Sequence, residues 1–331
     1  MKKSVIIAPL NWGLGHATRC IPLINKYLSD DWIVSIASDG ESLCLLQEEF
    51  PRLTFYEIPS YNVKYAQGNL MSFAILKQLP KLKKAIRLEN EWLNNHLQVN
   101  RYDLIISDNR FGFYSSACCS VFITHQLFIQ VPLIQKTINK INHAYIKMFD
   151  ECWVPDMEGK DNLSGKLSHG NLPVPVKYIG PLSRFVRKEI GLKYKVVAIL
   201  SGPEPSRERL EKRVIDVLRN VDDALLIRGV QISNEKRMIG KLEVLDHLTQ
   251  REIEEKITQS RVVLCRCGYS SIMDMVKLNK EAILIPTPGQ SEQEYLAIHL
   301  KKHQQFHFIK EEYLSSSLME LLEEFDFQKI S

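Results

Sequence analysis

Short runs of β-branched and other apolar residues alternate along the chain with longer segments in which apolar residues recur at helical spacing. This alternation is typical of parallel strands joined by crossover helices, because such strands are buried on both faces. We expect a first sheet from segments 4–9, 33–38, 53–58, 104–107 and 120–124. A second series is expected at 195–200, 224–227, 262–265 and 282–286, with helices that begin near Ser206, Glu252, Ser271 and Glu292. The pattern predicts an α/β protein with two sheets.

The periodicity breaks between residues 153 and 181, where glycines and prolines are frequent. Such a break indicates a junction, and 331 residues are more than one hydrophobic core usually organises. We therefore expect one domain at 1–179 and a second at 180–312. A terminal helix is expected within 313–331, and it could pack back on the first domain.

Composition narrows the class of protein. Hydrophobic residues make up 45% and charged residues 25%, as in ordinary folded proteins. A formal charge of +4 is too mild to indicate a nucleic-acid partner. The seven cysteines form no paired C-x-x-C motifs, which favours reduced thiols over disulfides or a zinc site. The apolar start is too short for a signal peptide and no segment reaches ~20 apolar residues, so we expect a cytoplasmic protein.

Three loops in the first half follow predicted strands, where parallel sheets bind ligands. The loop 9–19 contains Gly13 and Gly15, which allow close backbone approach, and His16 at the start of a helix. A histidine there could act as a base, or it could merely cap or pack. The loops after the strands near 105 and 122 carry further candidates, for which a turn aspartate and a capping histidine remain the alternatives. These candidates are Asp108, Arg110 and His125.

Two loops of the second half lead into helices. Backbone amides near Gly268 and the Ser270 hydroxyl could hold a phosphate at a helix N-terminus. Asp274, one turn further, could accept hydrogen bonds from a ribose diol, or it could simply compensate the helix dipole. The next loop is rich in amides and carboxylates that suit sugar hydroxyls, although residues 291–294 also fit a capping box. Its candidates are Gln290, Glu292, Gln293 and Glu294.

These last two stretches together resemble the donor half of the MurG-like glycosyltransferases of family 28, which make the lipid-linked disaccharide precursor of peptidoglycan. The order over 262–295 is a strand, Cys-Arg-x-Gly, a serine-bearing helix with an acidic residue, Ile-Pro, and Gln-x-Tyr. The opening Ala-Pro-Leu-Asn-Trp-Gly-Leu-Gly-His-Ala-Thr-Arg is similar to that of a related, broadly defined group of bacterial glycosyltransferases.

The resemblance implies a GT-B fold, in which two Rossmann-like domains with parallel sheets face each other across a cleft. Asp274 is then expected to bind the ribose of UDP, and Glu292 and Gln293 the donor sugar, with Gln290 and Glu294 beside them. Arg266, Gly268 and Ser270 are expected to line the nucleotide and diphosphate pocket. On the acceptor side, His16 matches the histidine that follows the glycine loop of the family. His16 is the first candidate for the base and Asp108 the second, and Gly13, Gly15, Arg110 and His125 are the further candidates on that side.

One departure concerns the loop that opens the second domain. It reads Ser201-Gly202-Pro203-Glu204-Pro205-Ser206 instead of a Gly-Gly-Ser type, and prolines lack N–H groups for a phosphate. Ser201 and Gly202 remain donor-site candidates, and either Arg207 or Arg209 could pair with the phosphate instead.

By resemblance, the expected activity is inverting, metal-independent transfer of N-acetylglucosamine or a similar hexose from a UDP-sugar. The acceptor is a glycan or a lipid-linked molecule of the cell envelope, and no cofactor besides the co-substrate is expected. A nucleotide-sugar hydrolase, an epimerase and a non-catalytic nucleotide-sugar-binding protein remain alternatives.

The segment 75–92 interleaves apolar residues with basic ones, and Pro80 interrupts or starts its helix. A basic amphipathic helix of this kind could rest on the inner face of the cell membrane, in weak peripheral contact. The alternative is an ordinary helix with its apolar side in the core and its lysines in water. The basic residues are Lys77, Lys81, Lys83, Lys84 and Arg87.

Overall fold

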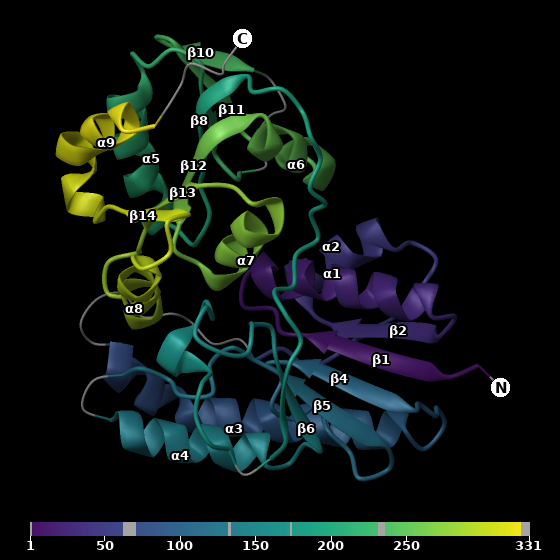
Figure 1. Cartoon of the computed structure of the whole chain (residues 1–331). Helices are drawn as coiled ribbons and strands as arrows, with labels where there is room; N and C mark the ends of the chain where they lie inside the picture. Colours follow the sequence, from purple (N-terminus) through teal and green to yellow (C-terminus); the bar gives the residue numbers. More distant parts are fainter. Residues whose placement is uncertain (1, 62–70, 132–133, 173, 231–235, 326–331) are drawn as a thin grey trace. The chain divides into compact units, whose positions relative to one another are not determined.

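The computed structural model describes residues 2–61, 71–131, 134–172, 174–230 and 236–325, with the side chains of 71–78 left out. The chain divides into two compact units, Met1–Arg184 and Phe185–Ser331, so the division falls slightly after the expected boundary at 179. Each unit consists of one sheet covered by helices on both faces (Figure 1). The expected α/β class with parallel sheets is confirmed.

The sheet of the first unit has the order β3-β2-β1-β4-β5-β6-β7, and all of its described pairings are parallel. The five expected strands are present within one or two residues of the expected bounds. Two further strands were missed because they are short and lie among the glycines and prolines of the expected junction. The strands are β1 (Ser4–Pro9), β2 (Ile33–Ser38), β3 (Thr54–Glu57), β4 (Leu104–Asp108), β5 (Cys119–Ile123), β6 (Glu151–Val154) and β7 (Val176–Tyr178).

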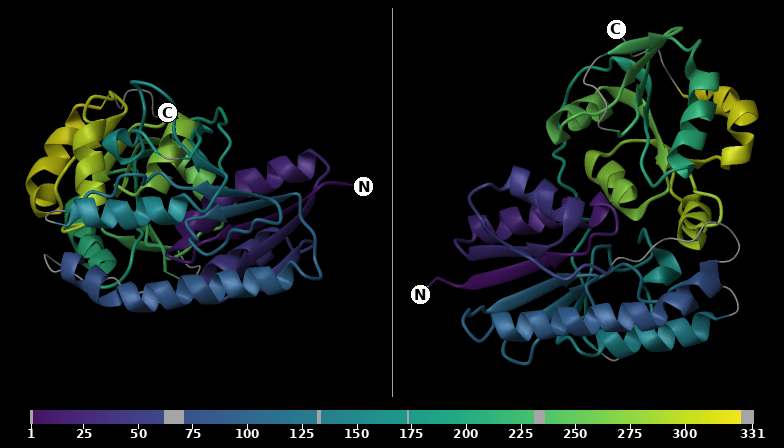
Figure 2. Two further views of the ribbon diagram at one scale, coloured as in Figure 1. Left: turned by 90° about the horizontal axis from the view of Figure 1, so that it is seen from below. Right: turned by 180° about the vertical axis from the view of Figure 1, so that it is seen from behind.

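Helices α1 (Leu14–Ser29) and α2 (Gly40–Glu49) cover one face of this sheet (Figure 1). Helices α3 (Met71–His96) and α4 (Gln135–Ile146) lie side by side on the other face (Figure 2). In α1, Ala17, Cys20, Ile21 and Ile24 recur at helical spacing and are buried, which packs the helix against β1 and β2. A 3₁₀ turn, η1 (Gly165–Leu167), precedes β7.

Among the described residues of α3, most of the apolar side belongs to the core and the basic side is exposed. Leu82, Ala85 and Ile86 pack with Leu10 and Tyr61. These residues of the helix therefore have the ordinary arrangement, whereas Leu88 is 39% exposed, and the weak peripheral contact with a membrane stays a prediction. Lys81, Lys83, Lys84 and Arg87 are exposed, whereas the side chains of residues 75–78 lie outside the described ones. Within the described residues, no helix is both long enough and apolar enough to span a bilayer.

The sheet of the second unit has the order β10-β11-β9-β8-β12-β13-β14 and is parallel except for the β10–β11 hairpin. The hairpin and β14 were not expected, because β10 is fully exposed and all three strands are short. The strands are β8 (Tyr194–Ile199), β9 (Ala224–Ile227), β10 (Arg237–Ile239), β11 (Leu242–Leu245), β12 (Ser260–Arg266), β13 (Ala282–Ile285) and β14 (Phe306–Phe308).

Helices again cover both faces: α5 and α9 one side, α6 and α7 the other (Figure 1). All four helix starts expected from the sequence are confirmed within two residues. The helical elements are α5 (Ser206–Leu218), α6 (Gln250–Thr258), α7 (Tyr269–Leu278), α8 (Ser291–Leu300), the 3₁₀ turn η2 (Glu311–Tyr313) and α9 (Leu314–Glu323).

The terminal helix α9 belongs to the second unit. Its Leu314, Leu318 and Leu322 are buried in one cluster with Leu210 and Val214 of α5. The leucines at this spacing form a single apolar stripe, and the core of the second unit uses it. The expectation that this helix also packs back on the first domain stays a prediction.

Candidate active site

Each sheet has one point at which the chain reverses its direction of winding. In the first sheet it lies between β1 and β4, which pair in parallel up to Pro9 and Asp108. In the second it lies between β8 and β12. Loops that leave such a point diverge to opposite faces and open a crevice beyond the carboxyl ends of the strands. The candidate residues end or follow the strands at these two points or the neighbouring strands β5 and β13.

At the switch point of the first sheet, His16 and Asp108 are in direct contact. His16 Nδ1 lies 3.0 Å from Asp108 Oδ1. Asp108 is fully buried, and 16% of the His16 side chain is exposed. The contact through Nδ1 places the opposite ring nitrogen, Nε2, on the side of the ring away from Asp108. The sequence thus identified two residues that the fold brings together from positions 92 apart.

A third residue of this cluster, Arg19, was missed. Its Nε donates to Asp108 Oδ2 at 2.6 Å, its Nη2 donates to Oδ1, and the same Nη2 lies 2.8 Å from His16 Nδ1. The signal was available, because residues three apart on a helix are neighbours and Arg19 follows His16 by three. An isolated arginine in an amphipathic helix gave no reason to look for a buried partner.

The electrostatics of the cluster give its members different roles. Burial favours the neutral Asp108 carboxyl, but Arg19 and His16 outweigh it and hold the pKa of Asp108 well below its usual range. Burial and then the Arg19 charge lower the pKa of His16, against the opposing effect of Asp108. His16 is therefore uncharged near neutral pH and able to accept a proton. Asp108, ionised and enclosed, is corrected from an alternative base to the residue that orients His16.

The two glycines of the first loop lie at the start of α1. Gly13 is exposed and has φ 84°, a backbone conformation that side chains disfavour. Gly15 is in the first turn, next to His16. Their arrangement keeps the backbone accessible beside the imidazole, as expected for a loop that contacts a ligand.

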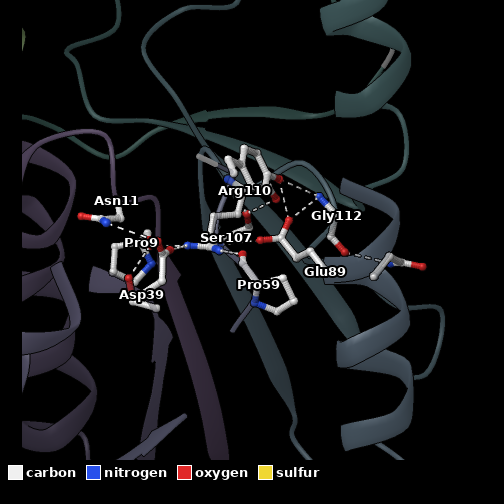
Figure 3. A network of polar contacts seen from close by, with 11 residues as sticks. Pro9, Asn11, Asp39, Pro59, Glu89, Ser107, Arg110 and Gly112 are labelled. Carbon is white, nitrogen blue, oxygen red and sulfur yellow. Dashed lines mark hydrogen bonds and ion pairs between the residues drawn. The ribbon is translucent and has the colours of Figure 1, made fainter. Parts of the chain in front are cut away.

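Arg110 was assigned to the acceptor side, and the structure corrects this (Figure 3). Its side chain is fully buried between Asp39 and Glu89, with 2.7 Å from Nη1 to Asp39 Oδ1. Nη2 donates to the carbonyl of Pro59 at 2.7 Å. The guanidinium thus ties β4 to α2, α3 and the segment after β3, and it is enclosed away from any acceptor.

His125 follows β5, the strand next to β4, and only 6% of the residue is exposed. Its charge, when present, contributes to lowering the pKa of His16, so the two imidazoles are close enough to interact. His125 therefore belongs to the same cluster, although its burial limits direct contact with a substrate.

In the second unit, the residues around the start of α7 lie where the sequence placed them. Gly268 is the N-cap residue, with extended backbone and no side-chain cap in the described structure. Ser270 is half-buried in the first turn and Asp274 half-buried in the second. A helix N-terminus with two polar side chains is suited to an anionic ligand with hydroxyl groups.

Arg266 was expected to line the nucleotide pocket, and the structure corrects this as well. Only 3% of its side chain is exposed. Nη1 donates to Glu311 Oε2 at 2.7 Å, and Nη2 donates to the Ser206 carbonyl at 3.0 Å. Through these contacts Arg266 fixes the start of α5. Its side chain is too enclosed to contact a ligand.

The loop that opens the second unit is exposed at Ser201 and at Gly202, which has φ 101°. Of the two arginines proposed to compensate for its prolines, Arg207 is buried between Glu204 and Glu211 and cannot reach a phosphate. Arg209 is half exposed, although its Nε donates to Glu311 at 2.7 Å. Arg209 is the better candidate of the two.

The start of α8 is organised differently from the expected capping box. Gln290, not Ser291, is the N-cap residue, and Glu294 Oε1 accepts from the Gly289 amide at 3.0 Å. Gln293 Oε1 accepts from the Thr287 amide at 2.9 Å, and its Nε2 donates to Gln290 at 2.6 Å. These amide groups hold the loop, and Glu292 is half-buried in the same turn.

Comparison with known proteins identifies the family that the second unit resembles. Residues 225–329 match the model of the glycosyltransferase family 28 C-terminal domain. A segment of 144 residues is 22% identical to the UDP-N-acetylglucosamine–N-acetylmuramyl-(pentapeptide) pyrophosphoryl-undecaprenol N-acetylglucosamine transferase of Caldicellulosiruptor saccharolyticus. That match covers 39% of this chain and 38% of the relative, so it spans well under half of the relative's length.

Solved structures match over nearly the whole chain. The calicheamicin glycosyltransferase CalG4 superposes with a TM-score of 0.68 at 10% identity, over 99% of this chain and 90% of that one. A putative UDP-N-acetylglucosamine 2-epimerase from Listeria monocytogenes gives 0.59 at 11% identity, over 98% and 88%. At these identities the likeness shows the fold, and both the expected GT-B fold and the resemblance to family 28 are confirmed. The chain has the GT-B fold, and residues 225–329 of its second unit match the glycosyltransferase family 28 C-terminal domain.

Proposed function

We propose that the protein is an inverting glycosyltransferase, which moves a hexose from a UDP-sugar to the hydroxyl group of a glycan or lipid-linked acceptor. The observation that carries the proposal is the His16–Asp108 contact of 3.0 Å at the switch point of the first sheet. An uncharged, partly exposed imidazole oriented by a buried carboxylate is the arrangement that general-base catalysis requires. The family 28 domain supports a nucleotide sugar as the donor.

In the proposed reaction, His16 Nε2 removes the proton of the acceptor hydroxyl. The oxygen forms a bond to the anomeric carbon from the face opposite the nucleotide, and the bond from that carbon to the diphosphate oxygen breaks. The electron pair leaves with UDP, and the configuration at the anomeric carbon inverts. Asp108 stabilises the imidazolium that forms, without taking the proton itself.

On the donor side, the proposal assigns the ribose to Asp274 and the diphosphate to the amides near Gly268, to Ser270 and to Arg209. Carboxylates accept two hydrogen bonds from a diol, and helix N-termini favour anions. With these groups to stabilise the leaving nucleotide, we propose that the reaction needs neither a metal ion nor a cofactor. Glu292 and Gln293 are assigned to the sugar hydroxyls, with Gln293 also holding its own loop.

The test is incubation with a panel of labelled nucleotide sugars, with and without membrane extract. Transfer of label only in the presence of extract supports a transferase with a lipid or glycan acceptor. Release of free sugar or conversion to an epimer without extract would instead establish a hydrolase or an epimerase.

The role of His16 is tested with His16→Ala, which should lower the turnover rate by ~10²-fold or more while the affinity for UDP stays near wild type. The matched control is Asp103→Asn, which removes an exposed carboxylate just before β4, at the opposite end of that strand from Asp108. Turnover by His16→Ala equal to that of the control would exclude His16 as the base.

A further inference from the structure

The buried guanidinium of Arg19 lies against both members of the His16–Asp108 pair. Only 3% of the side chain is exposed, and it approaches Asp108 side-on through Nε and Nη2. Such a two-point contact fixes the plane of a carboxylate, which a single contact does not. The oxygen that receives Nη2, Oδ1, is also the oxygen that His16 Nδ1 contacts, and the same Nη2 lies 2.8 Å from Nδ1. A guanidinium only donates, so Nδ1 either donates its proton to Oδ1 or accepts one from Nη2, and a role of Nε2 as the base requires the first of these tautomers.

We propose that Arg19 is a positioning residue of the candidate active site: it holds the Asp108 carboxylate so that Oδ1 faces His16 Nδ1, and the opposite nitrogen Nε2 is presented as the base. The proposal rests on the proposed function for the role of the base, and it adds a residue that acts through Asp108 and His16.

The arrangement has an electrostatic consequence. The charged or titratable groups that act on His16 are Arg19 from α1, Asp108 from β4 and His125 after β5, and the Cys20 thiol of α1 lies 3.5 Å from Asp108 Oδ2. Burial raises the pKa of the Cys20 thiol and keeps it neutral, so this thiol adds no charge to the cluster. Arg19 stays protonated because a guanidinium does not lose its proton in proteins. Arg19 both cancels the carboxylate that would otherwise favour an imidazolium and repels the imidazolium directly.

Charge and geometry can be separated with two substitutions. Arg19→Gln removes both, so the pKa of His16 should rise by about one pH unit, the order expected for one nearby charge. Arg19→Lys keeps the charge but loses the planar two-point contact, so the pKa should stay near wild type while turnover falls roughly tenfold to hundredfold. Cys20→Ala is the matched control, since it alters the same buried cluster without removing a charge.

The titration is followed by NMR of the imidazole signals in the full chain, with the His16 signal assigned by its loss in His16→Gln. The ¹⁵N shifts of the wild-type ring should show the proton on Nδ1 and Nε2 unprotonated. A proton on Nε2, or a His16 titration equal in wild type and Arg19→Gln, would overturn the proposal. If Arg19→Gln does not fold, Arg19→Lys decides: wild-type turnover would then refute the positioning role.

The NMR experiment needs no substrate, so the two proposals fail separately. A shifted titration in a protein that transfers no sugar would leave Arg19 as a positioning residue and remove the proposed function. An active enzyme in which Arg19→Gln moves neither the titration nor the acid limb of the kcat/KM profile would keep the function and remove the role of Arg19.

Discussion

Arg266 donates to Glu311 at 2.7 Å, although the two residues are 45 positions apart and only 3% and 2% of their side chains are exposed. Glu311 also accepts from Arg209, and Arg266 also donates to the Ser206 carbonyl. The turn η2, near the C-terminal end of the described chain, is thereby joined to the loop at the start of α5. The buried ion pair between Arg266 and Glu311 therefore holds this loop of the candidate donor site in position.

Glu311→Ala should destabilise the second unit by about 3–5 kcal/mol, because it leaves the Arg266 guanidinium buried without a counter-charge. Glu312→Ala is the control, since Glu312 is the exposed neighbour in the same turn. The measurement is urea unfolding of both variants. Midpoints that do not differ would mean that the ion pair contributes nothing beyond packing.

The corrected sites show what the sequence could and could not predict. Parallel strands and their loops were predictable, because buried runs and turn residues are local signals, and His16, Asp108, Gly268 and Asp274 were found by their place after strands. Whether an arginine faces a ligand or a buried carboxylate depends on partners far along the chain. Arg110 and Arg266 were therefore placed in the site although Glu89 and Glu311 enclose them.

Asp274→Ala should weaken UDP binding by about 1.5–3 kcal/mol, the scale of charge-assisted hydrogen bonds. Its place in the second turn of α7 suits a ribose held beyond Gly268. Calorimetry with UDP measures the effect, and Asp216→Ala, which removes an exposed carboxylate on α5, is the control. Equal UDP affinities for both variants would contradict the assignment of the ribose to Asp274.

The free energy of unfolding of the first unit should decrease in two steps as the pH is lowered. His16 has a lowered pKa in the folded chain, so its contribution declines as pH falls below about 6.5, where the unfolded chain takes up the proton. Asp108 also has a lowered pKa, and its contribution declines below about 3.9. Urea unfolding between pH 8 and 3 should show the first step in wild type and not in His16→Gln. A first step of the same size in His16→Gln would assign it to another group.

The last prediction concerns the membrane. The described part of α3 exposes Lys81, Lys83, Lys84 and Arg87, while Leu82, Ala85 and Ile86 are in the core. Leu88 is the exposed apolar residue of this described part, so little apolar surface can insert there, and the expected binding comes mainly from electrostatic attraction to anionic lipids, at about 1 kcal/mol for each basic residue near the surface. We therefore predict weak binding to anionic vesicles at low salt. High salt should abolish it, because ordinary salt already screens charges beyond ~10 Å.

Co-sedimentation with vesicles rich in phosphatidylserine at low and high salt measures the binding, and Lys83→Glu with Lys84→Glu should abolish it at low salt. The matched control reverses one lysine on each of two other helices, with Lys212→Glu on α5 and Lys277→Glu on α7, both exposed. Equal loss in both double variants would indicate attraction by net charge alone. Binding that persists in Lys83→Glu with Lys84→Glu, or none in wild type at low salt, would leave these lysines as a solvated helix face and favour a soluble acceptor.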